Sequence, residues 1–186
     1  MAFHERWFAA GKPKKYAEAL SHVPQVPGAL VEVGVWEGKS TIQLANAFPA
    51  EEVHAIDHWQ GDLTDPKSPV AAIAASRNVF ADFMENIKLA GVADRVVVHR
   101  MDWRDAFARW SYGPIKMLFI DGEHTFTEVA DNIDAGLPLM VPGGVMCGDD
   151  YGFSAVAKAV HSRLDERGQL TVLRGTGAAF WYWVNA

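Results

Sequence analysis

The sequence predicts an α/β fold: a Rossmann-like, doubly wound and mainly parallel sheet of seven strands with helices on both faces. Short apolar segments typical of buried strands alternate with longer segments of helical periodicity from residue 29 onward. Two apolar segments run directly into glycine and acidic residues, which predicts a ligand-binding edge at the carboxyl ends of the strands. Only a few residues around Gly175 and Gly177 separate the last two apolar segments, too few for a crossover helix. These two segments therefore predict an antiparallel C-terminal hairpin.

The remaining elements follow in a regular order along the chain. Strands are expected at residues 29–34, 53–57, 96–100, 115–121, 144–148, 170–174 and 178–185. Helices are expected at residues 39–48, 79–89, 104–110, 126–140 and 153–167. Residues 58–76 are polar and rich in turn-forming residues, so a long loop is expected there. A loop of this length in a compact domain is more often functional than idle.

A chain of 186 residues with 49% hydrophobic residues fits a single domain, residues 1–186. Residues 28–186 are expected to form the Rossmann-like core. Residues 1–27 are expected to form an N-terminal helical cap, because an amphipathic pattern, interrupted at Gly11 to Pro13, fills much of this segment.

Composition and charge exclude several classes of partner. The net charge is −6, and no run of basic residues exceeds the pair Lys14 and Lys15, so a nucleic-acid partner is not expected. The single cysteine, Cys147, provides no disulfide framework, and no apolar run is long enough for a membrane span. We expect a cytoplasmic protein without a membrane partner, and seven tryptophans make a homodimer or higher homo-oligomer a further expectation.

The first glycine-rich segment is one residue too short for a phosphate-binding loop. Such a loop needs four residues between its first glycine and Gly-Lys-Ser, because that length wraps backbone amides around the phosphates. Gly34 and Gly38 enclose only three residues, which include bulky Trp36 and anionic Glu37. The spacing therefore disfavours a nucleotide triphosphatase.

A dinucleotide is disfavoured for a different reason. The dinucleotide-binding turn needs glycine at position 36 so that the pyrophosphate can approach, and this residue is Trp36. S-adenosylmethionine (SAM) contains no pyrophosphate, and it needs a tight turn and an acid for its amino-acid end and a second acid for its ribose. Glu32, before the turn, and Asp57, at the end of the second strand, occupy those places.

The ordered set of motifs resembles the class I SAM-dependent methyltransferases, and within them the small metal-dependent O-methyltransferases of the macrocin and cephalosporin-pathway type. The motifs are Glu32-x-Gly34-x-x-x-Gly38-x-Ser40-Thr41, Asp57 with Trp59 close behind, Phe119-Ile-Asp121-Gly-x-His124 and Gly148-Asp-Asp-Tyr151. The resemblance covers roughly residues 28–184, and the predicted terminal hairpin agrees with the antiparallel last strand of that family.

This resemblance implies a set of cofactor-binding residues. They are Glu32, Gly34 and Gly38 at the methionine part of SAM, Asp57 at the ribose, Asp102 and Trp103 at the adenine, and, with no particular part of SAM assigned, Ser40, His58, Trp59 and Asp121. A carboxylate suits the ribose because its oxygens are paired acceptors. Structural alternatives remain open: Gly34 could be a simple strand-to-helix turn, Glu32 a structural acid, and Asp57 or Asp102 a helix cap.

Three carboxylates predict a metal site. Strands four and five are neighbours in the expected sheet, so Asp121, Asp149 and Asp150 emerge at the same edge. A divalent cation would relieve the repulsion among them, and oxygen ligands suit Mg²⁺, Mn²⁺ or Ca²⁺, with Mg²⁺ the expected ion. The alternative is that Asp149 or Asp150 caps the following helix and Asp121 merely ends a strand.

His124 is the expected catalytic base. Catechol-type relatives have lysine at this offset, whereas the macrocin type has the histidine that is its proposed base. An imidazole titrates near ~6.5 and can accept a proton from a metal-acidified hydroxyl. A surface histidine in a turn is the alternative.

The sequence as a whole predicts a SAM-dependent O-methyltransferase that acts, with metal assistance, on a small hydroxylated molecule such as a sugar, natural product or phenol. Two other hypotheses stay open. One is a metal-independent methyltransferase with His124 or Glu123 as the base, and the other is a catalytically silent SAM-binding module. No sequence rule fixes the acceptor.

Overall fold

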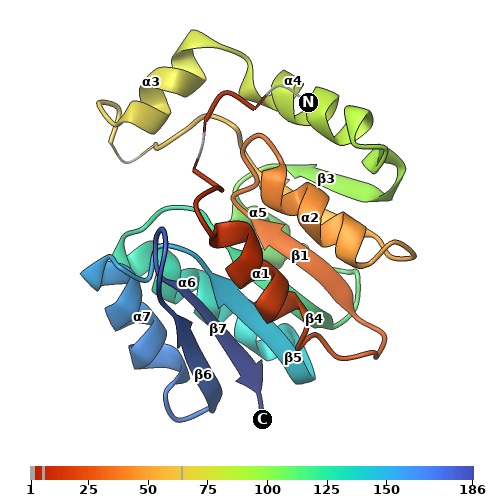
Figure 1. The fold of residues 1–186 in the computed structure, drawn as a ribbon, viewed down its shortest axis with the longest axis vertical. Coiled ribbons are helices and arrows are strands. Elements are labelled where there is room, and N and C mark those ends of the chain that lie inside the picture. The colour runs from red at the N-terminus through yellow and green to blue at the C-terminus, as the bar shows by residue number, and fades with distance from the viewer. Residues whose placement is uncertain (1–2, 6, 64) are drawn as a thin grey trace.

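The computed structural model describes residues 3–5, 7–63 and 65–186. They form a seven-stranded sheet in the order β3-β2-β1-β4-β5-β7-β6 (Figure 1). The strands are β1 (Ala29–Val33), β2 (Val53–Asp57), β3 (Val96–Arg100), β4 (Ile115–Ile120), β5 (Met140–Gly148), β6 (Gly168–Leu173) and β7 (Phe180–Asn185). The first five strands pair in parallel, whereas β7 is antiparallel to both β5 and β6. The predicted Rossmann-like fold with an antiparallel C-terminal hairpin is confirmed.

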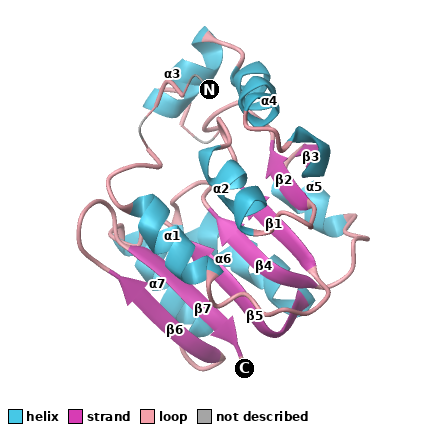
Figure 2. Cartoon of the chain, turned by 45° about the vertical axis from the view of Figure 1, so that its right-hand side comes forward, coloured by secondary structure: helices cyan, strands magenta, loops and turns pink. Residues whose placement is uncertain are grey.

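Helices cover both faces of this sheet, and Figure 2 shows the strands as the central layer. One face packs against α1 (Lys12–Leu20), α2 (Lys39–Ala47) and α4 (Val79–Leu89). The other face packs against α5 (Trp103–Ala108), α6 (Phe126–Gly136) and α7 (Ser154–Leu164). Every residue of β4 is buried, with Phe119 facing the first group of helices and Leu118 the second. A strand covered on both faces is mostly apolar, which is why the sequence shows a continuous apolar run at residues 117–120 instead of an alternating one. The exception is Lys116, whose ammonium forms an ion pair with Glu51 at 2.6 Å.

The N-terminal helix begins at Lys12. Gly11 precedes it in a left-handed conformation with φ of 95°, and proline lies in the first turn, where its missing N–H costs nothing. Tyr16 is fully buried and packs on Phe119 and Phe180, with ring centroids 4.5 and 6.0 Å apart. This packing fixes α1 against the sheet, beside the end of β5. Among the described residues, no helix is long and apolar enough to cross a bilayer.

The expectation of a loop throughout residues 58–76 was wrong for its second half. Residues 69–76 form α3 (Pro69–Ser76), in which the Ser68 side chain caps the Ala71 amide at 3.1 Å and Pro69 occupies the first turn. Four alanines then favour the helix. No residue of α3 is buried, so local propensity and capping, rather than core packing, explain why it forms.

The boundary between α6 and β5 also differs from the expectation. The helix ends at Gly136, a short 3₁₀ turn η2 (Leu137–Leu139) follows, and β5 begins at Met140. The proline in this turn lacks the N–H that would continue the helical pattern.

Candidate active site

A cavity of about 960 Å³ lies along the carboxyl ends of the parallel strands. This volume is typical of a site that encloses a ligand of cofactor size. Ten of the residues expected from the sequence line it: Gly34, Gly38, Ser40, Asp57, His58, Asp102, Trp103, Asp121, His124 and Asp150. The other three expected residues, Glu32, Trp59 and Asp149, are buried behind the lining.

The turn after β1 requires glycine at both ends. Gly34 and Gly38 have φ of 85°, and Trp36 between them is also left-handed, with φ of 47°. A side chain at Gly34 would lie 2.3 Å from the carbonyl oxygen of Asp121. The turn is therefore packed directly against the end of β4, and only glycine allows this approach.

Asp57 holds this turn from the neighbouring strand. Its Oδ2 accepts hydrogen bonds from the amides of Val35 and Trp36 at 3.1 and 3.0 Å, and its Oδ1 accepts one from Trp59 at 2.6 Å. Burial raises the pKa of this carboxyl above its usual value, although the backbone bonds oppose the shift. Each carboxylate oxygen has two acceptor sites, so a ligand hydroxyl can still bind at Asp57.

Glu32 lies beneath the turn, outside the cavity lining. Its side chain is fully buried, and the Ser40 hydroxyl donates a hydrogen bond to its Oε1. Burial raises the pKa of Glu32 to about 7, against the opposing effect of the hydrogen bond from Ser40. Glu32 thus joins β1 to the first turn of α2, and its expected contact with a ligand amino group stays a prediction.

The two residues after Asp57 differ in their surroundings. His58 lines the cavity, whereas Trp59 is buried among Phe80 and Phe83 and donates from its indole Nε1 to the Trp36 carbonyl at 2.8 Å. Trp59 has a left-handed backbone, with φ of 56°, and its indole packs in the core. Because this buried indole bonds the Trp36 carbonyl, Trp59 supports the turn from behind.

Asp102 and Trp103 line the part of the cavity beyond β3. Asp102 is the N-cap of α5 and accepts a hydrogen bond from the Arg104 amide at 2.8 Å. The helix-cap interpretation is therefore correct for Asp102, and it does not exclude a ligand contact, since the residue also lines the cavity. The Trp103 indole donates to Glu128 at 3.2 Å, which fixes the ring at this wall.

Beside the glycine turn, acidic residues gather after β4 and β5 and line the same cavity. Asp121, His124 and Asp150 each offer one ligand atom, and these atoms lie within 4.8 Å of one another. Burial, followed by the charge of Asp149, raises the pKa of Asp121 well above its usual value. Carboxylate oxygens with an imidazole form a donor set that fits a divalent cation.

The expected metal triad differs from this cluster at Asp149. The Asp149 side chain has no exposed surface and forms an ion pair with the Lys12 ammonium. Asp150 takes a left-handed conformation, with φ of 53°, and its carboxylate lies between His124 Nε2 at 3.1 Å and the Lys12 ammonium at 3.8 Å. The structure therefore brings together Asp121, His124 and Asp150, and sets Asp149 apart with Lys12.

His124 lies at the open side of this cluster. Its Nε2 is 3.1 Å from Asp150 Oδ2, and its ring stacks on Phe153 with centroids 5.5 Å apart. Burial acts to raise the pKa of Asp150, but the hydrogen bond with His124 and the charge of Lys12 outweigh it and hold the pKa below its usual value. The ring is thus oriented by a carboxylate on one edge and an aromatic face on the other.

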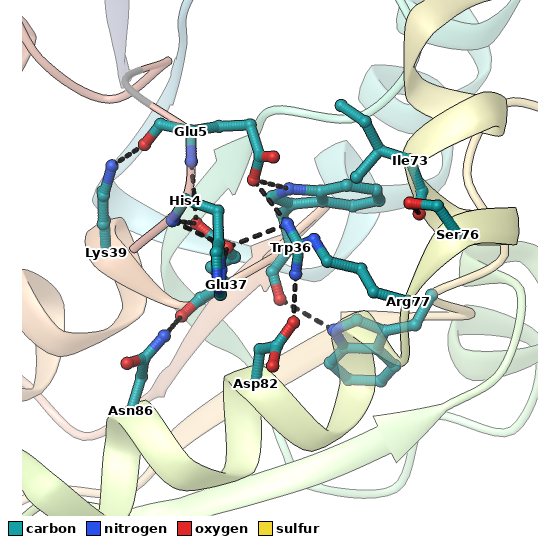
Figure 3. A network of polar contacts seen from close by, with 11 residues as sticks. His4, Glu5, Trp36, Glu37, Lys39, Ile73, Ser76, Arg77, Asp82 and Asn86 are labelled. Carbon is teal, nitrogen blue, oxygen red and sulfur yellow. Dashed lines mark hydrogen bonds and ion pairs between the residues drawn. The ribbon is translucent and has the colours of Figure 1, made fainter. Parts of the chain in front are cut away.

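The N-terminal segment supplies cavity residues that lie outside the sequence motifs: Glu5, Trp7, Phe8 and Lys12. Glu37 anchors this segment (Figure 3): its carboxylate accepts hydrogen bonds from the His4 amide at 3.1 Å and from Arg77 at 2.9 Å. Arg77 also binds Glu5 at 2.6 Å. No local sequence signal marks these partners, because they lie about 30 to 70 positions apart.

Comparison with known proteins agrees with the fold. A family model described as a methyltransferase domain matches residues 31–151. The chain is 28% identical, over 177 residues, to the 8-demethyl-8-(2,3-dimethoxy-alpha-L-rhamnosyl)-tetracenomycin-C 4'-O-methyltransferase of Streptomyces olivaceus, a match that covers 84% of this chain and 66% of the relative. It is 26% identical, over 160 residues, to the mycinamicin III 3''-O-methyltransferase of Micromonospora griseorubida, covering 77% of this chain and 63% of the relative. The chain thus spans just under two thirds of the length of these curated relatives.

Solved structures show the same fold. The O-methyltransferase NovP superimposes with a TM-score of 0.73 at 20% identity, over 94% of this chain and 79% of that chain. The O-methyltransferase TomG of Streptomyces achromogenes, solved in complex with SAM, gives a TM-score of 0.65 at 18% identity over 94% of this chain and 79% of that one.

The sheet order, the antiparallel last hairpin and the glycine turn over a deep cavity define the class of Rossmann-like, class I methyltransferases. The family model covers more than half of the chain, and the protein belongs to the methyltransferase-domain family. The resemblance found in the sequence is confirmed at this level.

Proposed function

We propose that the protein transfers the methyl group of SAM to a hydroxyl oxygen of a small molecule, with the help of a divalent cation. The observation that carries this proposal is the layout of the cavity. The glycine turn and Asp57 line the part proposed for the cofactor, called the cofactor end, and Asp121, His124 and Asp150 line the adjoining part, called the acceptor end. A methyl donor and a hydroxyl acceptor would therefore meet inside one enclosed space.

The cofactor end fits SAM in shape and polarity. The turn from Gly34 to Gly38 lines the cavity where the amino-acid end of the ligand would bind, and Asp57 retains acceptor capacity for the ribose. Asp102 and Trp103 provide a polar and an aromatic wall for the adenine. When bound, SAM supplies the methyl group on a sulfonium, which is a good leaving group.

The acceptor end fits a divalent cation through Asp121 and Asp150. Repulsion from neighbouring carboxylates contributes to the raised pKa of Asp121, so an added positive charge would be favourable there. When bound, such an ion supplies charge stabilisation and lowers the pKa of an acceptor hydroxyl.

His124 is the proposed proton acceptor. The Nε2 of its ring lies 3.1 Å from Asp150 Oδ2, and this contact orients the imidazole. The cavity walls would hold the acceptor in line, so positioning and electrostatics would provide much of the acceleration.

For the acceptor, we propose a sugar hydroxyl on a glycosylated natural product. The name of the tetracenomycin relative specifies O-methylation of a molecule that carries a rhamnosyl group. In this chain, Trp7, Leu63 and Phe153 line the cavity and are exposed at its rim. Such an apolar rim suits the aglycone of a glycoside, while the polar interior suits the sugar.

The test is an assay of the purified protein with SAM, Mg²⁺ and a panel of deoxysugar glycosides, their aglycones and free phenols. Mass spectrometry should find one added methyl group on a glycoside and not on its aglycone. Substituting the base, H124Q, should lower kcat by about 10²–10⁴-fold while calorimetry shows SAM affinity unchanged.

The other outcomes identify the rival functions. Full activity after exhaustive chelation would indicate a metal-independent methyltransferase. SAM binding without transfer to any acceptor of the panel would indicate a SAM-binding module. Binding of ATP in place of SAM would reject the proposal entirely.

A further inference from the structure

The first residue of α1 is a lysine in an electrostatically unfavourable position. The N-terminus of a helix carries a partial positive charge, and a cation there is destabilising unless an anion compensates it. Here the first turn contains Lys12, Lys14 and Lys15 and no acidic residue. The compensating anions of Lys12 come instead from the end of β5, more than a hundred positions later in the chain.

The start of α1 is fixed in place by the loop between β6 and β7. Lys15 Nζ donates to the carbonyl oxygens of Thr176 and Ala178 at 3.1 and 2.6 Å. The backbones pack so closely that an added side chain at Gly177 would lie 2.3 Å from the Ala10 carbonyl oxygen. Lys12 is therefore delivered to the cavity by an anchored segment.

The Lys12 ammonium lies among the acids of the cavity. It forms an ion pair with Asp149 and lies 3.8 Å from Asp150 Oδ1, and the Lys12 side chain is only 13% exposed. Burial lowers the pKa of Lys12, but the hydrogen bond and charge of Asp149 outweigh this effect and the pKa is raised, so the ammonium stays charged. If Asp121, Asp149 and Asp150 are all ionised, the Lys12 ammonium balances one of the three negative charges. The two that remain would be balanced by one divalent cation.

We propose that Lys12 is a positioning residue for the cation site, which holds Asp149 away from the cation and competes with the cation for Asp150. Lys12 then sets how tightly the site binds a divalent ion and leaves Asp121 and Asp150 as its carboxylate ligands. This inference rests on the proposed function, because it concerns the same metal site. It adds a role for a residue of the N-terminal helix, outside every motif of the sequence.

The test is the affinity of the full chain for Mn²⁺, measured by titration calorimetry without SAM or acceptor. In K12M the loss of the ammonium should tighten Mn²⁺ binding by about tenfold or more. The conservative variant K12R should bind as the wild type does. K158M, which removes an exposed lysine from α7, is the control for net charge and should not change the affinity.

A double variant separates Lys12 and Asp149 and also covers the case in which K12M fails to fold around an unpaired buried acid. K12M/D149N removes both charges of the ion pair, so its Mn²⁺ affinity should return close to that of the wild type. It should exceed that of D149N, in which Lys12 is free to bind Asp150. Circular dichroism confirms that each variant is folded.

Two results would overturn the inference. The first is Mn²⁺ binding that is unchanged or weaker in K12M, together with no difference between D149N and K12M/D149N. The second is the absence of Mn²⁺ binding in every variant, which would also remove the metal from the proposed function. Calorimetry with SAM on the same proteins tests the transferase part separately, so the two failures are distinguishable.

Discussion

At the scale of single residues, Glu32 shows how burial changes an acid. The Glu32 carboxyl is fully buried under the turn between Gly34 and Gly38, where the Ser40 hydroxyl donates a hydrogen bond to it, and its pKa rises to about 7. In the unfolded chain, the same group titrates near ~4.3. The folded protein therefore binds more protons than the unfolded chain between these two values.

This difference predicts a pH dependence of stability. Because the folded pKa is raised, the contribution of Glu32 to the free energy of unfolding is fully present below about pH 4 and is lost as the pH rises towards 7, by roughly 3 kcal/mol. E32Q cannot ionise, so its stability should fall less over this window than that of the wild type. Urea denaturation of both proteins without ligand, from pH 5 to 8, measures the difference. Parallel curves would show that Glu32 does not titrate in this range.

At the scale of elements, the turn after β1 is held from outside by two segments that are distant in sequence. Arg77, at the end of α3, binds Glu5 at 2.6 Å and Glu37 at 2.9 Å and also forms an ion pair with Asp82 (Figure 3). Trp36 donates from its indole to Glu5 at 3.2 Å and packs on Trp7, with centroids 5.4 Å apart. The glycine turn, α3 and the N-terminal segment thus share one ion-pair network.

Loss of Arg77 should therefore make the turn between Gly34 and Gly38 more mobile. In R77M the buried carboxylate of Glu37 loses its cation, and we expect affinity for S-adenosylhomocysteine to fall about tenfold, whereas R77K should keep most of the wild-type affinity. Hydrogen exchange at His4 and Glu5 should become faster in R77M. The matched control is R163M. It removes the ion pair in which Arg163 Nε of α7 lies 2.8 Å from Asp134 Oδ2 of α6, on the other face of the sheet. Equal effects of R77M and R163M on ligand affinity would contradict the role of the network.

At the scale of the whole molecule, the cavity joins elements of both halves of the sheet. Its lining includes residues that follow β1, β2, β3, β4 and β5 and residues of the N-terminal segment. A ligand bound there contacts segments that would separate on unfolding. Ligand binding should therefore be visible as a rise in the stability of the entire domain.

We expect S-adenosylhomocysteine at 100 times its Kd to stabilise the protein by about 2.7 kcal/mol and to raise Tm by roughly 5 to 10 °C. ATP at the same concentration should not change Tm, because the turn is one residue too short to wrap a triphosphate. Differential scanning fluorimetry with both ligands makes the comparison. A larger shift with ATP would reverse the assignment of the cavity.

Local patterns predicted most of the fold. The strands at residues 53–57 and 96–100 have the expected bounds, because the apolar runs are short and end at turn residues or charges. The helix α3 was not expected, because polar and turn residues before Pro69 hid an alanine-rich segment that forms a helix without burial. Ten of the expected site residues line the cavity, since parallel strands end at a common edge and the sequence marks those ends with glycine and acid residues.

By itself, the sequence determined the Rossmann-like sheet, its antiparallel hairpin and the absence of a phosphate-binding loop, because each depends on spacing between near neighbours. Only the tertiary structure decided which charges meet. It paired Asp149 with Lys12 and Glu37 with His4 and Arg77, and left Asp121, His124 and Asp150 together at the cavity. Coulomb interactions act through space, so partners far apart along the chain are set by packing, and no local pattern encodes them.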